Sequence, residues 1–488
     1  MRPSHDLASR LSPVALATLA SLAACSTDPA PPSTTDSGPP PMDVSVTDTP
    51  AVDVRPPPVD KLPPLDSIFV PIDTPQPTDG PIEEFIEPAD VPAPTDGPRA
   101  QCEITPAVAT HVNAMATGGW AALNRTRGLL MHGCSGATRP QDCLASAPLV
   151  NTTSFGSMWP TLAGTRLKLL FTSTYSSPFW SRSSADGRFV AHGNRIVDLT
   201  GPRVITTGAQ YDPGFFPDNS SFVFHTSGGP RVCMQSLLST GMPTNVTLNE
   251  PECVRIGSIA LYEHPGVSLN GQDYFVVYGR YTSDNGGHNP TLSDPAAGFG
   301  AGEVTRLTLM ANTGSSFREV TTASVATPME ADPILSPSSQ LLMMRLAGTG
   351  GAQSAFVLRR LQITRTGNAL TVTAPVIARY CQSGAKGSIS YDERWFAYHH
   401  YITAADATDL GFTGPNDPAF AAYRTRGAAN VYLVDLRTGE RRRLTNMQPG
   451  QYALYPHFRS DGWIYFIVRT AGMTPEHIVA SDAALALP

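Results

Sequence analysis

The chain has 488 residues and a formal net charge of −7, and 41% of its residues are hydrophobic. This length and composition predict a folded region with a sizeable core. Lysine occurs only at positions 61, 168 and 386, and no basic stripe is interleaved with aromatic residues. The excess of arginine over lysine is typical of GC-rich coding bias, and the lack of a basic stripe argues against a nucleic-acid partner.

The N-terminus has the pattern of an export signal. Arg2 and Arg10 flank its start, and an apolar run of 14 residues follows from Leu11 to Ala24. That run is shorter than the roughly 20 residues that a membrane-spanning helix needs. It ends in the sequence Leu-Ala-Ala-Cys at positions 22–25, which resembles the lipobox of bacterial lipoproteins.

The lipobox resemblance implies a lipid anchor on Cys25. Residues 1–24 are then the signal peptide, and the acylated cysteine holds the chain at a membrane of the cell envelope. Ser26 follows the cysteine where an aspartate would favour inner-membrane retention, so the resemblance implies the outer membrane of a Gram-negative bacterium. The alternative is an ordinary secretory signal with an incidental cysteine.

Residues 25–100 are predicted to form a disordered stalk behind the lipid. Residues 26–100 contain 20 prolines, and 11 Asp and 3 Glu against 2 Arg and 1 Lys give a net charge of −11. Such a segment cannot bury enough apolar surface to offset its ordering entropy, and proline and like charges extend it. A proline-rich docking motif is the alternative.

Six cysteines follow Cys25, an even number that favours disulfides in an exported protein. Sequence alone permits 15 pairings. Pairing near neighbours joins Cys134 to Cys143 and Cys233 to Cys253, which leaves Cys102 and Cys381. A metal site is the rival interpretation, but no CxxC pair is present.

Residues 101–150 are predicted to form a small, partly helical, cysteine-containing segment. Thr105-Pro106 is a plausible helix start, and Gly118-Gly119 interrupts the pattern. Beyond Val150 the chain consists of short β-rich runs between turn-forming residues.

One segment recurs six times in residues 151–488. Each copy has a small or turn-forming anchor, a turn, and then a dense apolar strand. The copies are SRSSADGRFVAHG from Ser181, PGFFPDNSSFVFH from Pro213, PGVSLNGQDYFVVYG from Pro265, PILSPSSQLLMMRLA from Pro333, GSISYDERWFAYHH from Gly387 and PHFRSDGWIYFIVR from Pro456. A turn residue stands five positions after every anchor: Asp186, Asp218, Asn270, Ser338, Asp392 and Asp461.

This repeat predicts an all-β fold, a six-bladed β-propeller of four-stranded antiparallel blades. Asp-Gly and Asn-Gly favour a tight hairpin turn in which both central residues have positive φ. The strand after the turn is apolar on both faces, as expected for a strand packed between neighbouring blades. The sixth copy ends one strand short, and residues 165–174 are predicted to supply its fourth strand and close the ring.

The repeat resembles that of the TolB-like propeller family, approximately x-P-x-(aromatic)-S-P-D-G followed by an apolar strand. VYLVDLRTGERRRLT at positions 431–445 is similar to the way that family ends a blade. The resemblance covers roughly residues 165–488 and implies a fold rather than a function. No α/β domain precedes the predicted propeller, so a role in the Tol–Pal system is not carried over.

Catalytic signatures are scarce in the sequence. It has no G-x-S-x-G elbow, no H-E-x-x-H helix and no phosphate-binding G-x-x-x-x-G-K loop. His399 and His400 are adjacent on a predicted strand, so they point to opposite faces and cannot jointly chelate one ion. We therefore expect a non-catalytic binding or scaffold module for an envelope protein or a polar ligand, with no cofactor. The alternative is a lyase-like or lactonase-like propeller enzyme with a metal or acid–base site at the channel mouth.

One face of the predicted propeller is the best candidate for ligand contact. Both long insertions, at 279–302 and 402–429, fall between the second and third strands of a blade. The residues just before the six anchors should lie on the same face beside the channel: Trp180, Asp212, His264, Asp332, Lys386 and Tyr455. The alternative is that they only cap strand ends and bind water.

Replacing the acylated residue tests the anchor. We expect Cys25→Ser to stop acylation and to move the protein from the membrane fraction to the soluble fraction. Cell fractionation followed by immunoblotting measures the distribution, with Ser26→Ala as the matched control. A Cys25→Ser protein that stays wholly with the membranes would contradict the lipobox interpretation.

Overall fold

A computed structural model describes residues 102–119, 121, 129–150, 165–174, 181–201, 203–209, 213–226, 229–239, 245–246, 253–256, 261–280, 304–347, 353–471 and 473–487. The predicted signal peptide, Cys25, the stalk and the insertion at 281–303 lie outside this set. All described residues belong to the compact unit that ends at Pro488. No helix among them is long and apolar enough to span a membrane.

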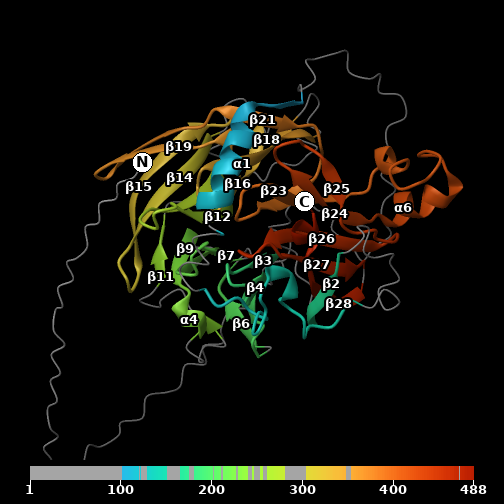
Figure 1. Cartoon of the computed structure of the whole chain (residues 1–488), viewed down its shortest axis with the longest axis horizontal. Coiled ribbons are helices and arrows are strands. Elements are labelled where there is room, and N and C mark those ends of the chain that lie inside the picture. Colours follow the sequence, from blue (N-terminus) through green and yellow to red (C-terminus); the bar gives the residue numbers. More distant parts are fainter. Residues whose placement is uncertain are drawn as a thin grey trace, which may run out of the picture. The chain divides into compact units, whose positions relative to one another are not determined.

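The described residues are mostly β, in groups of four antiparallel strands (Figure 1). The first group is β3 Ser181–Ser183, β4 Phe189–His192, β5 Arg195–Asp198 and β6 Arg203–Thr207; the second is β7 Gly214–Phe215, β8 Ser221–Thr226, β9 Gly229–Met234 and β11 Cys253–Arg255. The third group is β12 Leu261–Val267, β13 Tyr274–Arg280, β14 Val304–Asn312 and β15 Phe317–Ala326.

The remaining groups follow the same antiparallel order. The fourth is β16 Glu330–Leu335, β17 Leu341–Ala347, β18 Gln353–Arg360 and β21 Val376–Tyr380; the fifth is β22 Ala385–Ile389, β23 Trp395–Tyr401, β24 Ala429–Asp435 and β25 Arg441–Arg443. The sixth combines β26 Gln451–Phe458, β27 Ile464–Thr470 and β28 Met473–Ser481 with β2 Leu167–Ser173. Additional short strands are β1 Glu103–Ile104, β10 Asn245–Val246, β19 Gln362–Thr366 and β20 Ala369–Thr373.

The first strands of these groups contact one another in sequence. β3 contacts β7, β7 contacts β12, and the series continues through β16, β22 and β26, which contacts β3 again. The predicted extra strand is also present, because β2 pairs antiparallel with β28 and places Leu167 opposite Ser481. A strand from before the first group therefore completes the last one, as the sequence predicted.

The hairpin turns differ from the expected type. Only the residue after each turn residue is left-handed: Gly187, Asn219, Gly271, Ser339, Glu393 and Gly462, with φ between 53° and 99°. The backbone N–H of each of these residues donates to the carbonyl three positions earlier, at 2.7–3.1 Å. The expectation of two positive-φ residues was wrong, because this longer turn needs only one left-handed residue to rejoin the strands.

Side-chain hydrogen bonds explain the recurring turn residue. In every copy its side-chain oxygen accepts from the backbone N–H two residues later; at Asp186 the acceptor meets the N–H of Arg188 at 3.0 Å. In four copies the hydroxyl of a serine two positions before the turn residue accepts the backbone N–H of the residue five positions after that serine. The pairs are Ser184 with Phe189, Ser268 with Asp273, Ser336 with Leu341 and Ser390 with Trp395. The repeat therefore places side-chain hydrogen-bond acceptors at the same backbone positions of each turn.

The strand after each turn is buried on both faces, as predicted. β4 and β27 are examples: all of Phe189–His192 is buried, as is the apolar run from Ile464 to Val468. Such strands pack between the sheets of neighbouring groups, and their side chains supply most of the core.

Residues 102–119 are tied to the fourth and fifth groups. Helix α1 Pro106–Gly118 begins after Thr105 and ends at Gly119, as predicted, and lies along β21 (Figure 1). β1 pairs with β21, and Cys102 is bonded to Cys381. His111 Nε2 lies 2.6 Å from Glu393 Oε2, and both side chains are buried. The second Glu393 oxygen accepts the Ser338 N–H, so this carboxylate joins three segments.

The structure forms three disulfides, and these pair Cys102 with Cys381, Cys134 with Cys143 and Cys233 with Cys253. The pairing agrees with the near-neighbour expectation. Register explains the third bond, because Cys233 on β9 lies directly opposite Cys253 on β11.

Two features were not expected. A β19–β20 hairpin is inserted between β18 and β21. The insertion between β23 and β24 contains short helices: η3 Ala404–Asp406, η4 Pro418–Phe420 and α6 Ala421–Arg426. The other helices are η2 Pro140–Asp142, α4 Ser236–Ser239 and α7 Ala483–Ala486.

Removing one turn serine should lower stability. Ser336 is fully buried, and its hydroxyl accepts the Leu341 N–H at 3.0 Å. Ser336→Ala leaves that buried N–H without this acceptor, so we expect a loss of about 1–2 kcal/mol in the free energy of unfolding. Urea denaturation measures it, and the exposed Ser315→Ala is the control. Equal effects of the two substitutions would contradict the role assigned to the turn serine.

Candidate functional site

The structure describes four of the six predicted site residues, each on the first strand of its group. His264 lies on β12, Asp332 on β16, Lys386 on β22 and Tyr455 on β26. All four are buried, with exposures of 2–5%. Trp180 and Asp212 lie outside the described residues. A group this deeply buried can contact a small ligand but not the surface of a folded protein.

The backbone changes register at these four positions. In each of these groups the pairing register between the first and second strands changes within the three or four residues that include the predicted site residue. Asp332, Lys386 and Tyr455 have φ of 54°, 39° and 58°. Left-handed non-glycine residues cost about 1 kcal/mol or more, and bulges of this kind redirect side chains beside functional sites.

Lys386 and Tyr455 meet at His399, and Asp332 is linked to this ring through Arg345. Asp332 Oδ2 forms a buried ion pair with Arg345 Nη1 at 2.6 Å. Burial lowers the pKa of His399 well below its ordinary value, and the charges of Lys386 and Arg345 lower it further. The Tyr455 N–H donates to His399 Nδ1 at 3.4 Å, and the two rings meet edge to face.

His264 belongs to the same cluster, because the charge of Lys386 acts on its ring as well as on that of His399. Its Nε2 lies 3.4 Å from Arg182 Nη2, and burial lowers its pKa, followed by the charges of Arg182, His457 and Lys386. Burial also lowers the pKa of His457 to about 3, and Arg182 adds to that effect. We call Arg182, His264, Asp332, Arg345, Lys386, His399, Tyr455 and His457 the inner-strand cluster.

The cluster borders a small cavity of about 30 Å³, with Arg182, His264 and His457 in its lining. That volume is about enough for one water molecule. Five of the lining residues stand one position after a repeat anchor: Arg182, Gly214, Ile334, Ser388 and His457. Residues two apart on a strand share a face. Arg182 and His457 were not among the predicted site residues, although this alternation places them on the same face as the predicted positions before the anchors.

His399 presents a hydrogen-bond donor inside the cluster. Its Nδ1 accepts from a backbone N–H, so the proton of the neutral ring lies on Nε2. This buried Nε2 meets no hydrogen-bond partner of good geometry among the described residues, although the Lys386 backbone carbonyl is near enough to raise the pKa of the ring. An acceptor atom of a ligand would satisfy it, since a buried donor left unpaired costs about 1–3 kcal/mol.

His400 faces away from His399, as the strand geometry predicted. Its Nε2 lies 2.8 Å from Asp406 Oδ2 in the β23–β24 insertion. Burial alone would raise the pKa of Asp406, but hydrogen bonds from His400 and Thr403 lower it. His400 therefore holds the insertion in place rather than contributing to the inner-strand cluster.

Metal-binding geometry occurs elsewhere in the described residues. Cys134, Cys143 and Asp461 are the one set of His, Cys, Asp or Glu ligands there that lies close enough to share an ion. The two sulfur atoms are bonded to each other, so they are not available as thiolate ligands.

Comparisons with known proteins give only distant likenesses. No family model and no curated protein matches the chain. Oligogalacturonate lyase from Vibrio parahaemolyticus is 9% identical, covers 68% of this chain and 97% of its own, and has a TM-score of 0.37. The β-propeller domain of Cps50 (Swd1) from Myceliophteria thermophila is 11% identical and covers 64% of this chain and 99% of its own, also with a TM-score of 0.37.

A third solved structure is similar over a comparable length. Acylaminoacyl peptidase from Pyrococcus horikoshii is 10% identical, covers 69% of this chain and 53% of its own, and has a TM-score of 0.32. At these scores no activity or site residue passes from these proteins to this chain.

The buried imidazoles predict acid sensitivity. The unfolded chain protonates its histidines near pH 6.5, whereas His457 in the folded protein stays neutral to about pH 3. The free energy of unfolding should therefore fall as the pH falls below 6.5. His457→Asn should make this fall shallower by up to about 1.4 kcal/mol per pH unit. Urea denaturation from pH 7 to pH 4.5 measures both slopes, and identical slopes would contradict a neutral His457.

Proposed function

We propose that this chain is an exported lipoprotein, anchored at the outer membrane through Cys25, and that residues 151–488 form a closed, TolB-like, six-bladed propeller. The cyclic contacts of the first strands and the β2–β28 pair support ring closure. The lipobox sequence supports the anchor. The propeller acts as a non-catalytic binding module, and its ligand is a small anionic molecule held by the inner-strand cluster.

The observation that carries this proposal is the positive field in the cluster. Arg182, Lys386 and Arg345 share the cluster with a single carboxylate, Asp332, and each of these cations lowers the pKa of a neighbouring buried imidazole. Three imidazoles stay neutral in that field and offer hydrogen bonds rather than charge. Such a site favours a carboxylate or similar anion, with His399 Nε2–H as an additional donor.

The enzymatic alternative also has one observation in its favour. His264 is a neutral buried imidazole near Arg182 and Lys386, a combination suited to proton transfer beside an anionic substrate. His399 is less suited to be a base, because its Nδ1 is already occupied by the Tyr455 N–H. Binding accounts for both rings, so it is the function that we favour.

Titration with formate, the smallest carboxylate, tests the binding proposal, because the cavity beside the cluster has room for little more than one water molecule. We expect formate to bind to the purified full-length protein, with an affinity that falls as salt is added, and the neutral formamide not to bind. Lys386→Met should weaken formate binding at least tenfold, while Arg255→Gln, a charge change at an exposed residue of β11, should leave it unchanged. Isothermal titration calorimetry measures the affinities. Equal formate affinity in wild-type and Lys386→Met protein would contradict the proposal.

Elemental analysis of the purified protein separates the two functions. We expect substoichiometric metal. A tightly held, stoichiometric ion that survives dialysis would favour the enzymatic alternative over simple binding.

A further inference from the structure

A second and larger cavity lies at the turn ends of the fifth and sixth groups, under a cap loop formed by residues 129–147. Its volume is about 330 Å³. The described residues that line it are mostly apolar, with Tyr391, Trp395 and Phe458 on the propeller side and Leu129 and Met131 on the cap side. Ligand pockets of proteins begin at about this volume.

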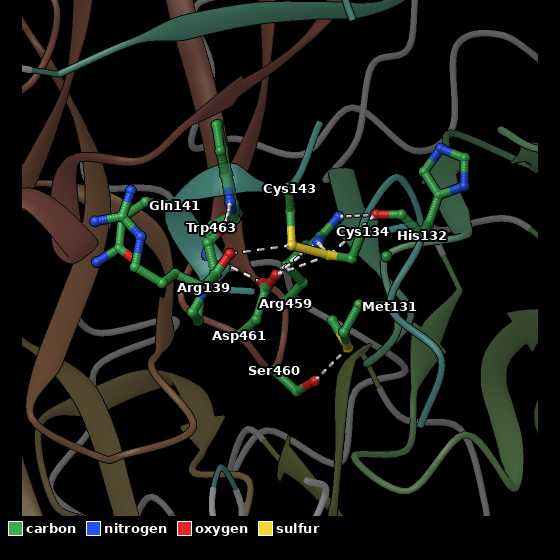
Figure 2. Close-up of a disulfide and its surroundings, with 12 residues drawn as sticks. Met131, His132, Cys134, Arg139, Gln141, Cys143, Arg459, Ser460, Asp461 and Trp463 are labelled. Carbon is green, nitrogen blue, oxygen red and sulfur yellow. Dashed lines mark hydrogen bonds and ion pairs between the residues drawn. A yellow bond between two sulfur atoms is a disulfide. The ribbon is translucent and has the colours of Figure 1, made fainter. Parts of the chain in front are cut away.

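Arg459 holds the cap in place at the position where four of the other five copies of the repeat have serine. It stands three residues after its anchor, as Ser184 and Ser390 do in their copies. Its fully buried guanidinium pairs with Asp461 at 2.6 Å and donates to the His132 carbonyl at 3.0 Å. Nη2 also lies 3.2 Å from Cys134 Sγ (Figure 2). The sixth copy has thus exchanged a turn serine for a residue that reaches the cap.

Further contacts make the cap a fixed part of the fold. The Cys134–Cys143 disulfide closes the loop on itself (Figure 2). Trp463 Nε1 donates to the Pro140 carbonyl at 2.8 Å, and the His132 N–H donates to the Asp186 carbonyl at 2.8 Å. The cavity is therefore enclosed by held side chains on both sides, as in a preorganised binding site.

Tyr391 separates this cavity from the small one beside the inner-strand cluster, since it lines both. Its side chain is 5% exposed and borders both cavities. Burial raises the pKa of Tyr391, and the Asp186 and Asp218 carboxylates add to this, so the hydroxyl remains a neutral donor. An acceptor atom of a ligand within the cavity would accept a hydrogen bond from this hydroxyl.

Acidic turn residues set the charge preference of this cavity. Asp392 and Asp461 line it, and no cation other than Arg139 lines it among the described residues. Arg139 lies at the exposed rim and is paired with Asp142 at 2.8 Å. An anion would therefore lose its hydration without gaining a buried counter-charge. This preference is the reverse of that of the inner-strand cluster.

We propose that the capped cavity is a binding site for a small, uncharged, ring-containing molecule whose acceptor atom meets the Tyr391 hydroxyl. The aromatic side chains of Trp395 and Phe458 pack against the ring of the ligand. The cavity volume limits the ligand to one or two fused rings. This inference goes beyond the proposed function and does not depend on it.

Three probes with one ring system test the site. 2-Naphthol is neutral and carries an acceptor oxygen, naphthalene lacks the oxygen, and 2-naphthoate is anionic. We expect 2-naphthol to bind at micromolar concentration and 2-naphthoate at least tenfold more weakly, as measured by ligand fluorescence with the full chain. Binding of 2-naphthoate as tight as that of 2-naphthol would overturn the proposal.

Two substitutions locate the binding. Ala484→Trp on α7 fills the cavity and should abolish 2-naphthol binding, while Ala486→Trp on the same helix is exposed and should preserve it. Tyr391→Phe should weaken 2-naphthol at least fivefold and leave naphthalene unchanged. Retained 2-naphthol binding in Ala484→Trp, or equal losses for both probes in Tyr391→Phe, would overturn the proposal.

Formate titration of the same variants serves as the check on folding and on independence. Ala484→Trp should bind formate as the wild type does, because the small cavity beside the inner-strand cluster lies on the other side of Tyr391. Failure of formate binding in the wild type would contradict the proposed function alone, and the naphthol results would still stand.

Discussion

The whole described fold depends on one hydrogen bond that is repeated in each group: a turn side chain accepting the backbone N–H two residues later. It fixes the hairpin after every first strand, and so it fixes the register of the strand that is buried on both faces. Once that register is set, the residues around each anchor must lie on the inner side of their group. The chemistry of the inner-strand cluster is therefore a consequence of turns that contribute no atom to it.

The same regularity makes departures from it informative. Three of the first strands carry a left-handed, non-glycine residue at the position before the anchor. Glycine would adopt this conformation at the lowest cost if only the backbone mattered. Asp332, Lys386 and Tyr455 stand there instead, so the strained backbone positions carry side chains of the inner-strand cluster. Arg459 departs from the pattern in a different way, since it keeps the turn and adds a contact to a distant segment.

Much of the architecture could be predicted from the sequence because the turn requirement is local. The positions of Asp186 or Asp392 reveal where a hairpin lies, and an apolar run after the turn reveals burial on both faces. The extra strand β2 could be predicted because the sixth copy was short. The turn type was mistaken, because the preference for Asp comes from its acceptor oxygen here and not from tolerance of positive φ.

The site was less predictable because its contacts join distant segments. In the sequence His399 is marked only as the neighbour of His400 on a strand, and only the approach of β26 brings the Tyr455 N–H to its ring. No local pattern marks Glu393 as the partner of His111, which lies 282 residues away. A buried ion pair such as Asp332–Arg345 likewise follows from the arrangement of strands and not from any motif.

The Cys102–Cys381 bond also determines how the molecule bears load. Cys102 precedes β1 and α1, so a pull on the chain before it reaches the fold through this covalent link next to β21 of the fourth group. The force then enters a sheet whose strands are hydrogen-bonded side by side, while β2, which completes the sixth group, lies further along the chain. A force applied on the N-terminal side of Cys102 therefore does not load the β2–β28 pair directly.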